Sequence, residues 1–348
     1  MTDAEFSADD SALPIDEAAL ARYLKGRLFG FEGELQVRQF AGGQSNPTYL
    51  LQSGERSWVL RKKPPGELLP KAHMVEREYR IFTALADTDV PVPRTELLCE
   101  DRSILGTEFF VMQYLQGRIF WDPTLPECRP ADRPGIYDEM NRVLAALHGV
   151  DYGAVGLGDF GRPGNYFARQ IGRWSKQYEA SATGELSSMD RLMQWLPQNI
   201  PADDSSCIVH GDFRLDNMIF HPTEPRVLAV LDWELSTLGH PLADLAYNCM
   251  PYHVPSRGAP ALSEVAGGDS GIPLEAEYVA RYCERTGRTG IDDFRFYLVF
   301  SIFRYAAIVQ GVYARGLRGN ASSAEGAREM RARAVQSADI AWNLVQQG

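Results

Sequence analysis

The chain of 348 residues is long enough for two packed domains, and its contents of 45% apolar and 23% charged residues are those of a soluble globular protein. A formal net charge of -11 argues against nucleic acid or an anionic membrane as a partner. No apolar run approaches the roughly 20 residues that a membrane-spanning helix needs, and the acidic, polar N-terminus does not have the pattern of a secretory signal.

The first 115 residues predict a small β-rich lobe behind a flexible leader at residues 1–15. Leu20, Tyr23 and Leu24 recur at helical spacing and predict a short helix. Three strands joined as an antiparallel meander are predicted by the runs at 35–40, 48–51 and 57–61. A helix with one apolar face and a buried strand are expected next, at 73–86 and 109–112.

Residues 116–348 predict a larger lobe that is mainly helical. Its expected elements are an amphipathic helix at 135–149, a long helical stretch at about 165–198, short strands between 207 and 232, a surface loop at 255–273 and a buried helix at 294–313. The fold class is therefore α+β, with an antiparallel β-rich N-terminal lobe over 1–115 and a helical C-terminal lobe over 116–348.

The five cysteines are scattered along the chain and contain no CxxC pair. An odd, spread set of this kind is typical of reduced thiols, and not of a disulfide framework or a zinc site. We therefore expect a cytoplasmic protein.

The strongest chemical pattern is His-Gly-Asp-Phe-Arg-Leu-Asp-Asn at residues 210–217, followed by a predicted β-hairpin. The hairpin consists of a strand at 218–220, a turn at 221–226 and a returning strand at 227–231. The start of the first strand of an antiparallel pair lies beside the end of the second. Asn217 and Asp232 should therefore reach the same rim, with Asp212 on the loop just before them.

These three residue types suit phosphoryl transfer. A carboxylate together with an amide oxygen is a ligand set for Mg²⁺, which fills its remaining positions with water and phosphate oxygens. A separate carboxylate can orient a substrate hydroxyl and accept its proton. Phosphoryl transfer otherwise needs a positive group on the phosphates and a positioned acceptor.

The pattern His-Gly-Asp-x-x-x-x-Asn resembles the protein-kinase catalytic loop, with Gly in place of Arg, and Asp232 is placed like the metal-binding Asp of Asp-Phe-Gly. This version is typical of the aminoglycoside phosphotransferase and choline kinase-like family. The segments 59–66 and 238–247 resemble the branch whose phosphotransferase domains are linked to acyl-CoA dehydrogenases. The resemblance covers about residues 30–320 and implies a protein-kinase-like two-lobed fold.

The resemblance implies a role for each matching residue, with ATP and Mg²⁺ as cofactors. Asp212 is implied as the catalytic base, and Asn217 and Asp232 as the metal ligands. Arg61 stands at the position of the phosphate-binding cation, and Glu78 at that of its helix partner. The remaining nucleotide-binding residues implied are Gly42, Gly43, Gln44, Ser45 and Asn46 over the phosphates, and Gln113, Tyr114 and Leu115 at the hinge beside the adenine.

The sequence departs from the family pattern at three points. Arg61 replaces the usual Lys, so Lys62 or Lys63 could contact the phosphates instead. The glycine-rich turn is not GxGxxG. Trp233 follows Asp232, so a Phe-based activation switch is not expected. For His210 we expect a structural role in the loop, and for Asp244 a role as a buried anchor of that loop.

The leading hypothesis is thus an ATP-dependent kinase for a small hydroxylated molecule, with a hydroxy acid or hydroxyacyl-CoA indicated only by the dehydrogenase-linked branch. An aminoglycoside kinase, a non-catalytic nucleotide-binding scaffold and a two-metal hydrolase are the alternatives. The acceptor, the preference for ATP or GTP and the oligomeric state stay open. Candidate acceptor-site residues are Arg173, Trp174, Tyr178, Tyr252 and Arg304.

Overall fold

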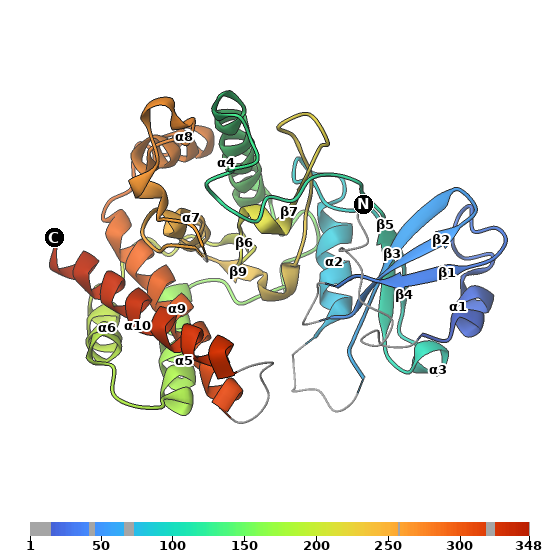
Figure 1. The fold of residues 1–348 in the computed structure, drawn as a ribbon, viewed down its shortest axis with the longest axis horizontal. Coiled ribbons are helices and arrows are strands. Elements are labelled where there is room, and N and C mark those ends of the chain that lie inside the picture. The colour runs from blue at the N-terminus through green and yellow to red at the C-terminus, as the bar shows by residue number, and fades with distance from the viewer. Residues whose placement is uncertain (1–14, 42–45, 66–72, 257, 318–323, 348) are drawn as a thin grey trace. The chain divides into compact units, whose positions relative to one another are not determined.

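The computed structural model describes residues 15–41, 46–65, 73–256, 258–317 and 324–347, which form two compact units (Figure 1). Unit 1 comprises Met1–Arg118 together with Met218–Glu234, and unit 2 comprises Ile119–Asn217 together with Leu235–Gly348. The expected α+β class is confirmed, because unit 1 is built on an antiparallel sheet and unit 2 is mainly helical. Most of the expected leader, residues 1–14, lies outside the described residues.

Unit 1 contains a five-stranded antiparallel sheet (Figure 1). The strand order is β1-β2-β3-β5-β4, so the first three strands form the meander expected from the sequence. Strand β5 then pairs with β3 and β4. The bounds are Gln36–Gln39 for β1, Thr48–Ser53 for β2, Arg56–Lys62 for β3, Thr95–Cys99 for β4 and Phe109–Gln113 for β5.

A helix covers each face of this sheet. Successive strand side chains point to opposite faces, so the contacts of neighbouring residues show which helix covers which face. Leu20 and Leu24 of α1 (Glu17–Leu24) pack into one apolar cluster with Leu60 of β3. On the other face, the ring of Phe82 of α2 (Val75–Leu85) lies 6.1 Å from that of Phe110 of β5, centroid to centroid. The buried stripe of α2 also contains a glutamate, Glu78.

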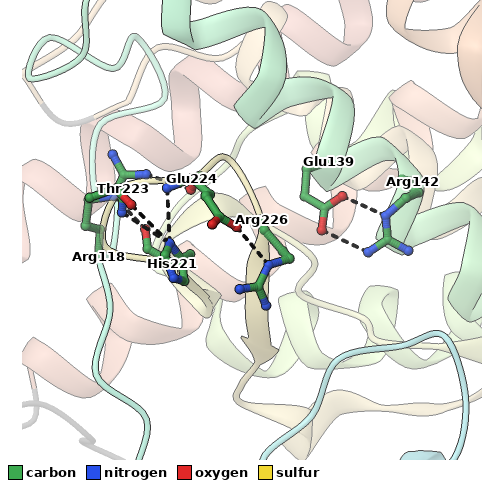
Figure 2. A network of polar contacts seen from close by, with 7 residues as sticks. All are labelled: Arg118, Glu139, Arg142, His221, Thr223, Glu224 and Arg226. Carbon is green, nitrogen blue, oxygen red and sulfur yellow. Dashed lines mark hydrogen bonds and ion pairs between the residues drawn. The ribbon is translucent and has the colours of Figure 1, made fainter.

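The predicted hairpin is present and belongs to unit 1. Strands β7 (Met218–Phe220) and β8 (Val227–Val230) pair antiparallel, with Met218 opposite Val230. Its turn is fastened to the rest of the unit by Arg118, whose guanidinium donates hydrogen bonds of 2.9 Å to the carbonyl oxygens of His221 and Glu224 (Figure 2). The ring of His221 accepts from the N–H of Thr223 and Glu224, which closes the turn on itself.

Unit 2 consists of helices around one long apolar helix, α9 (Phe294–Arg315), which packs against α5, α7 and α10. The expectation that no apolar run is long enough to span a membrane was wrong, because α9 could do so by length and composition. Its most apolar window is 78% buried inside the protein, as predicted for a core helix. The other helices are α3 (Arg102–Leu105), which belongs to unit 1, and α4 (Arg133–Gly149), α5 (Tyr166–Ser181), α6 (Ser187–Gln198), α7 (Pro241–Cys249), α8 (Glu275–Thr286) and α10 (Ala324–Gln346) of unit 2.

Unit 2 also contains a short two-stranded sheet. Strands β6 (Cys207–Val209) and β9 (Thr237–Gly239) pair antiparallel, and they lead into the loop at 210–217 and into α7 respectively. Helix α4 carries its own two-pronged ion pair, in which the guanidinium of Arg142 donates to both carboxylate oxygens of Glu139 at 2.6 and 2.8 Å (Figure 2).

Candidate active site

In unit 1 one arginine lies between two carboxylates. Nε of Arg61 on β3 is 2.9 Å from Oε2 of Glu78 on α2. Nη2 of Arg61 donates a hydrogen bond of 3.1 Å to Oδ1 of Asp232, the second residue after the end of β8. The exposed fractions of the side chains are 2% for Glu78, 11% for Arg61 and 36% for Asp232. Three of the residues singled out in the sequence therefore form one chain of ion pairs, with Asp232 as its most exposed member.

The two neighbouring lysines point elsewhere. Nζ of Lys62 donates to the carbonyl oxygen of Leu105 at 3.1 Å, and Nζ of Lys63 lies 2.9 Å from a carboxylate oxygen of Glu76. The alternation along β3 places Arg61 and Lys62 on opposite faces of the sheet. Arg61 is on the face that α2 covers, and it is therefore the cation that reaches Glu78.

Burial makes this ion-pair chain sensitive to charge. Burial raises the pKa of Glu78 to about 7, although the positive charge of Arg61 acts against that rise. Burial alone would lower the pKa of Arg61, but the charges of Glu78 and Asp232 raise it above its usual value. Arg61 therefore stays positively charged, while Glu78 changes its charge near neutral pH.

The backbone at Asp232 has a left-handed conformation, with a φ of 63°. Such a φ is uncommon outside glycine, although Asp tolerates it better than most residues. Oδ1 of Asp232 is bound by Arg61, and within the described residues Oδ2 accepts no hydrogen bond. The conformation thus gives Asp232 one carboxylate oxygen on the guanidinium and one that is available to a cation.

In unit 2 a buried aspartate holds the backbone of the loop at 210–217. Asp244 of α7 accepts hydrogen bonds from the N–H groups of His210 at 2.5 Å and Gly211 at 2.8 Å. Its burial would by itself raise its pKa, but the proximity of His148, whose Nε2 lies 3.6 Å from Oδ2, and the N–H of Gly211 lower it, so the carboxylate stays ionised. The anchoring role expected for Asp244 is confirmed.

The loop also requires a glycine at position 211. Gly211 has a φ of 84°, and a Cβ placed there would lie 2.9 Å from the carbonyl oxygen of Leu235. Nη2 of Arg304 donates a hydrogen bond of 2.6 Å to the carbonyl oxygen of Gly211. His210 is fully buried, and its Nδ1 accepts from the N–H of Asp212 at 3.2 Å, in agreement with the structural role expected for it.

The carboxylate of Asp212 is held by three side chains. The hydroxyl of Tyr247 on α7 donates to its Oδ1 at 2.6 Å. Nε of Arg214 is 3.3 Å from the same oxygen. Nδ2 of Asn217 donates to Oδ2 at 3.0 Å and to the carbonyl oxygen of Asp212 at 2.8 Å. The Asp212 side chain is nevertheless 19% exposed, so it is both oriented and accessible.

The amide orientation of Asn217 bears on metal binding. Because its Nδ2 is committed to Asp212, its Oδ1 is left without a hydrogen-bond donor in the described part of the chain. Asn217 in unit 2 and Asp232 in unit 1 each present one oxygen of the kind that Mg²⁺ prefers. Among the described residues there is no group of three or more His, Cys, Asp or Glu side chains that could hold a metal by itself. Asn217 and Asp232 can thus each offer a single oxygen to an ion, whose further ligands would be water and phosphate oxygens.

The remaining nucleotide-binding candidates lie in unit 1. Gly42, Gly43, Gln44 and Ser45 are outside the described residues. Asn46 is 1% exposed, and its Oδ1 is a buried acceptor that has no hydrogen-bond partner within the described ranges.

The three hinge candidates follow one another at the end of β5. Gln113 is the last residue of that strand, and its N–H donates to the carbonyl oxygen of Arg94 at 2.8 Å. Tyr114 and Leu115 come next and are half-buried. In the sheet, Arg61 lies opposite Phe110, which comes three residues before Gln113.

A cavity of about 330 Å³ lies within unit 2, beside the catalytic loop. None of the five acceptor-site candidates named from the sequence lines it. Its wall combines apolar side chains with two arginines and two aspartates. The lining residues are Trp121, Asp122, Pro123, Tyr137, Met140, Arg214, Leu215, Asp216, Tyr247, Asn248, Met250, Pro251, Val254, Pro255, Ser256, Leu262, Tyr305 and Arg333.

The sequence analysis missed Tyr247 and Arg214 as partners of Asp212. A usable signal was present, because Asp244, Tyr247 and Asn248 are spaced i, i+3 and i+4 and so lie on one side of a helix. Once Asp244 is taken as an anchor of the loop, the same spacing points Tyr247 and Asn248 at that loop.

Comparison with known proteins gives consistent matches. Residues 36–290 match the model of the phosphotransferase enzyme family. Acyl-CoA dehydrogenase family member 10 of Mus musculus is 49% identical over 336 residues, which are 95% of this chain and 31% of the mouse protein. The chain thus spans about a third of the length of that curated relative.

Solved structures give the same result. A "putative aminoglycoside phosphotransferase" of Ralstonia eutropha JMP134 is 50% identical, with a TM-score of 0.87 over 96% of this chain and 99% of the other. A thermostable mutant of aminoglycoside phosphotransferase APH(4)-Ia, in a ternary complex with AMP-PNP and hygromycin B, has a TM-score of 0.61. It is 17% identical and covers 92% of this chain and 98% of its own, so it shows the fold alone. The kinase-like fold expected from the sequence is confirmed.

The raised pKa of Glu78 predicts a pH-dependent stability. Between the pKa of an unfolded glutamate, about 4.3, and about 7, the folded state keeps a proton that the unfolded state has released. Stability should therefore fall as pH rises through this window, by roughly 2 to 4 kcal/mol. Glu78→Gln has no such proton. The melting temperature of the variant relative to that of the wild type should therefore increase from pH 5 to pH 8. Parallel pH curves for the two proteins would refute the assignment, and Glu76→Gln on the same helix is the matched control.

Asp244→Asn tests the loop anchor. The amide can accept through one oxygen only, so one of the buried N–H groups of His210 and Gly211 loses its partner. We expect a loss of about 2 to 4 kcal/mol in the free energy of unfolding, measured by denaturant titration. An unchanged midpoint would mean that Asp244 does not hold the loop.

Proposed function

The chain belongs to the phosphotransferase enzyme family, and on this premise we propose that it transfers the γ-phosphate of ATP to a hydroxyl group of a small molecule with the help of Mg²⁺. The observation that carries the proposal is the carboxylate of Asp212, which is 19% exposed and is oriented by Tyr247, Arg214 and Asn217. Two of these partners, Tyr247 and Arg214, line the cavity. An oriented, accessible carboxylate next to a cavity is what a general base for an alcohol requires.

In the proposed reaction Asp212 accepts the proton of the acceptor hydroxyl. The proton must leave as the alcohol oxygen forms its bond to phosphorus, and a carboxylate held in one orientation meets that need without rearranging. Asp244 and Arg304 have an indirect role, because their hydrogen bonds to the backbone of Gly211 fix the position of the next residue, Asp212.

Arg61, Glu78 and Asp232 serve the nucleotide in this proposal. The ion pair with Glu78 holds Arg61 in place, and Arg61 in turn orients Asp232. Asn217 and Asp232 would hold the metal through Oδ1 and Oδ2 respectively. Bound Mg²⁺ would neutralise the charge of the phosphate oxygens. The buried Oδ1 of Asn46, which has no hydrogen-bond partner among the described residues, supports a bound group that carries a donor.

For the acceptor we propose a hydroxy acid or its CoA thioester. The similarity to an acyl-CoA dehydrogenase family member supports this class. The cavity supports it too, since two arginines, Arg214 and Arg333, balance two aspartates, Asp122 and Asp216, and the rest of the wall is largely apolar. A polycationic aminoglycoside would be expected to need an excess of acidic groups. A non-catalytic scaffold would have no need of an oriented Asp212.

We propose a cytoplasmic setting for the reaction. All five cysteines of the described chain are free, and four of them are buried, which supports a reducing compartment.

Asp212→Asn is the direct test of the base. The amide cannot accept a proton, so kcat should fall by about 100- to 10,000-fold, while the Kd for MgATP measured by calorimetry should stay within about threefold of wild type. Asp138→Asn is the control, because Asp138 pairs with Arg281 and Arg285 on the surface. Wild-type turnover in Asp212→Asn would exclude Asp212 as the base.

The acceptor is found by following ADP release from MgATP with hydroxy acids, their CoA thioesters, sugars, amino alcohols and aminoglycosides. We expect turnover with the first two classes. Turnover with aminoglycosides alone would replace the proposed acceptor, and binding of MgATP without turnover on any class would favour a scaffold.

A further inference from the structure

Helix α7 meets the catalytic loop through three side chains on one side of the helix. Asp244 accepts from the N–H groups of His210 and Gly211. One turn later, Tyr247 donates to the carboxylate of Asp212. The next residue, Asn248, donates from Nδ2 to the carbonyl oxygen of Phe213 at 3.1 Å, and its Oδ1 accepts from a buried tyrosine at 2.6 Å. Of these three contacts, only that of Tyr247 is made to the reacting side chain.

The surroundings of Tyr247 keep its hydroxyl protonated, so that it acts as a hydrogen-bond donor. Its side chain is 6% exposed, and the guanidinium of Arg304 lies over its ring, 5.3 Å from the centroid. Burial and the negative charge of Asp212 raise its pKa well above the usual value. The hydroxyl therefore keeps its proton at neutral pH and donates it in the hydrogen bond to Oδ1 of Asp212.

The two oxygens of Asp212 are not equivalent. An ionised carboxylate offers about four lone-pair directions, two on each oxygen. Oδ1 faces two donors, the hydroxyl of Tyr247 and Nε of Arg214. Oδ2 faces one donor, Nδ2 of Asn217. The contact of Arg214 is an ion pair at 3.3 Å and not a hydrogen bond, so two side chains crowd Oδ1. Among the described residues, Oδ2 has Asn217 as its one partner and is the less occupied oxygen of this carboxylate.

We propose that Tyr247 is a positioning residue for the base: by occupying Oδ1 together with Arg214, it fixes the plane of the Asp212 carboxylate and leaves Oδ2 as the atom that receives the proton of the acceptor. This inference rests on the proposed function. It assigns to Tyr247 a part in the chemical step, separate from packing and from nucleotide binding.

The step balances without a further reactant. The O–H bond of the acceptor breaks and its proton moves to Oδ2. The freed electron pair on the alcohol oxygen forms the bond to the γ-phosphorus. The bond between that phosphorus and the bridging oxygen breaks, and its electrons leave with ADP. Tyr247 keeps its own proton throughout, so it donates a hydrogen bond and transfers nothing.

The test is Tyr247→Phe, which removes the hydroxyl and keeps the ring under Arg304. We expect kcat to fall by about 10- to 100-fold, the range for loss of a hydrogen bond to a charged group. The KM values for MgATP and for the best acceptor of the screen should stay within about twofold. Unchanged kcat, or a raised acceptor KM at unchanged kcat, overturns the proposal, the latter because it makes Tyr247 a wall of the acceptor site only.

Tyr252→Phe is the matched control. Tyr252 is also buried, and its hydroxyl donates a hydrogen bond of 2.8 Å, but to the carbonyl oxygen of Pro273 and not to the catalytic loop. The sequence named Tyr252 as a candidate for the acceptor site, but the structure does not place it in the lining of the cavity, so it has no part in the proposed site. We expect wild-type kcat for this variant. An equal loss of kcat in both variants would show that any buried hydroxyl of unit 2 matters, and would overturn the specific role of Tyr247.

A structural readout separates this proposal from the proposed function. In crystal structures of the wild type and Tyr247→Phe, the Asp212 carboxylate should turn about its Cβ–Cγ bond in the variant while the backbone of the loop stays in place. If the wild type transfers phosphate to no acceptor, the proposed function fails, and the orientation of Asp212 still decides the role of Tyr247. A carboxylate that does not turn overturns that role.

Discussion

The chemistry proposed for this chain depends on one buried carboxylate, Asp244, that accepts the N–H groups of two successive residues of the catalytic loop. The hydrogen bond from the N–H of Gly211 to Asp244 holds the left-handed backbone at Gly211. This backbone carries the next residue, Asp212. The arrangement requires a permanently ionised group inside the protein, which is costly unless its hydrogen bonds are satisfied. The interactions with His148 and the loop backbone supply that satisfaction.

Unit 1 follows a different electrostatic design around Arg61. Here a buried glutamate with a pKa near neutrality, an arginine and a half-exposed aspartate form a chain in which each charge depends on the next. Arg61 keeps its positive charge because the carboxylates of Glu78 and Asp232 raise its pKa above the usual value. Asp232 is oriented by that group through one oxygen only, which leaves the other for a cation.

Much of the fold follows from local pattern. The alternation along β1 to β3 and the turn residues between β7 and β8 specify strands that the structure contains, and the uniformly apolar α9 is a core helix as expected. Strand β4 was missed because Thr95–Cys99 does not alternate, and four of its five residues are only half-buried. The break that separates α5 from α6 at 182–186 was missed as well, since the apolar spacing continues across it.

The site was less accessible to sequence reasoning than the fold. Spacing along the chain identified Asp212, Asn217 and Asp232 as residues of interest, but their roles stay proposals. It could not choose among Arg61, Lys62 and Lys63, because that choice depends on which face of the sheet α2 covers. It also missed Tyr247, although the helical spacing from Asp244 points this residue at the loop, because the contact with Asp212 joins residues 35 positions apart through the packing of α7. Residues 218–234, which contain the hairpin, belong to unit 1 although they follow a part of unit 2 in the sequence. A division of the chain at one boundary cannot describe this arrangement.

The central claim is that phosphate passes from a nucleotide to an alcohol oxygen, and ³¹P NMR of the products tests it most directly. With MgATP and a hydroxy acid or its CoA thioester, the account predicts ADP and a new phosphomonoester signal split by the proton on the carbinol carbon. Inorganic phosphate as the sole new signal, with every class of alcohol offered, would show transfer to water only and would contradict the account.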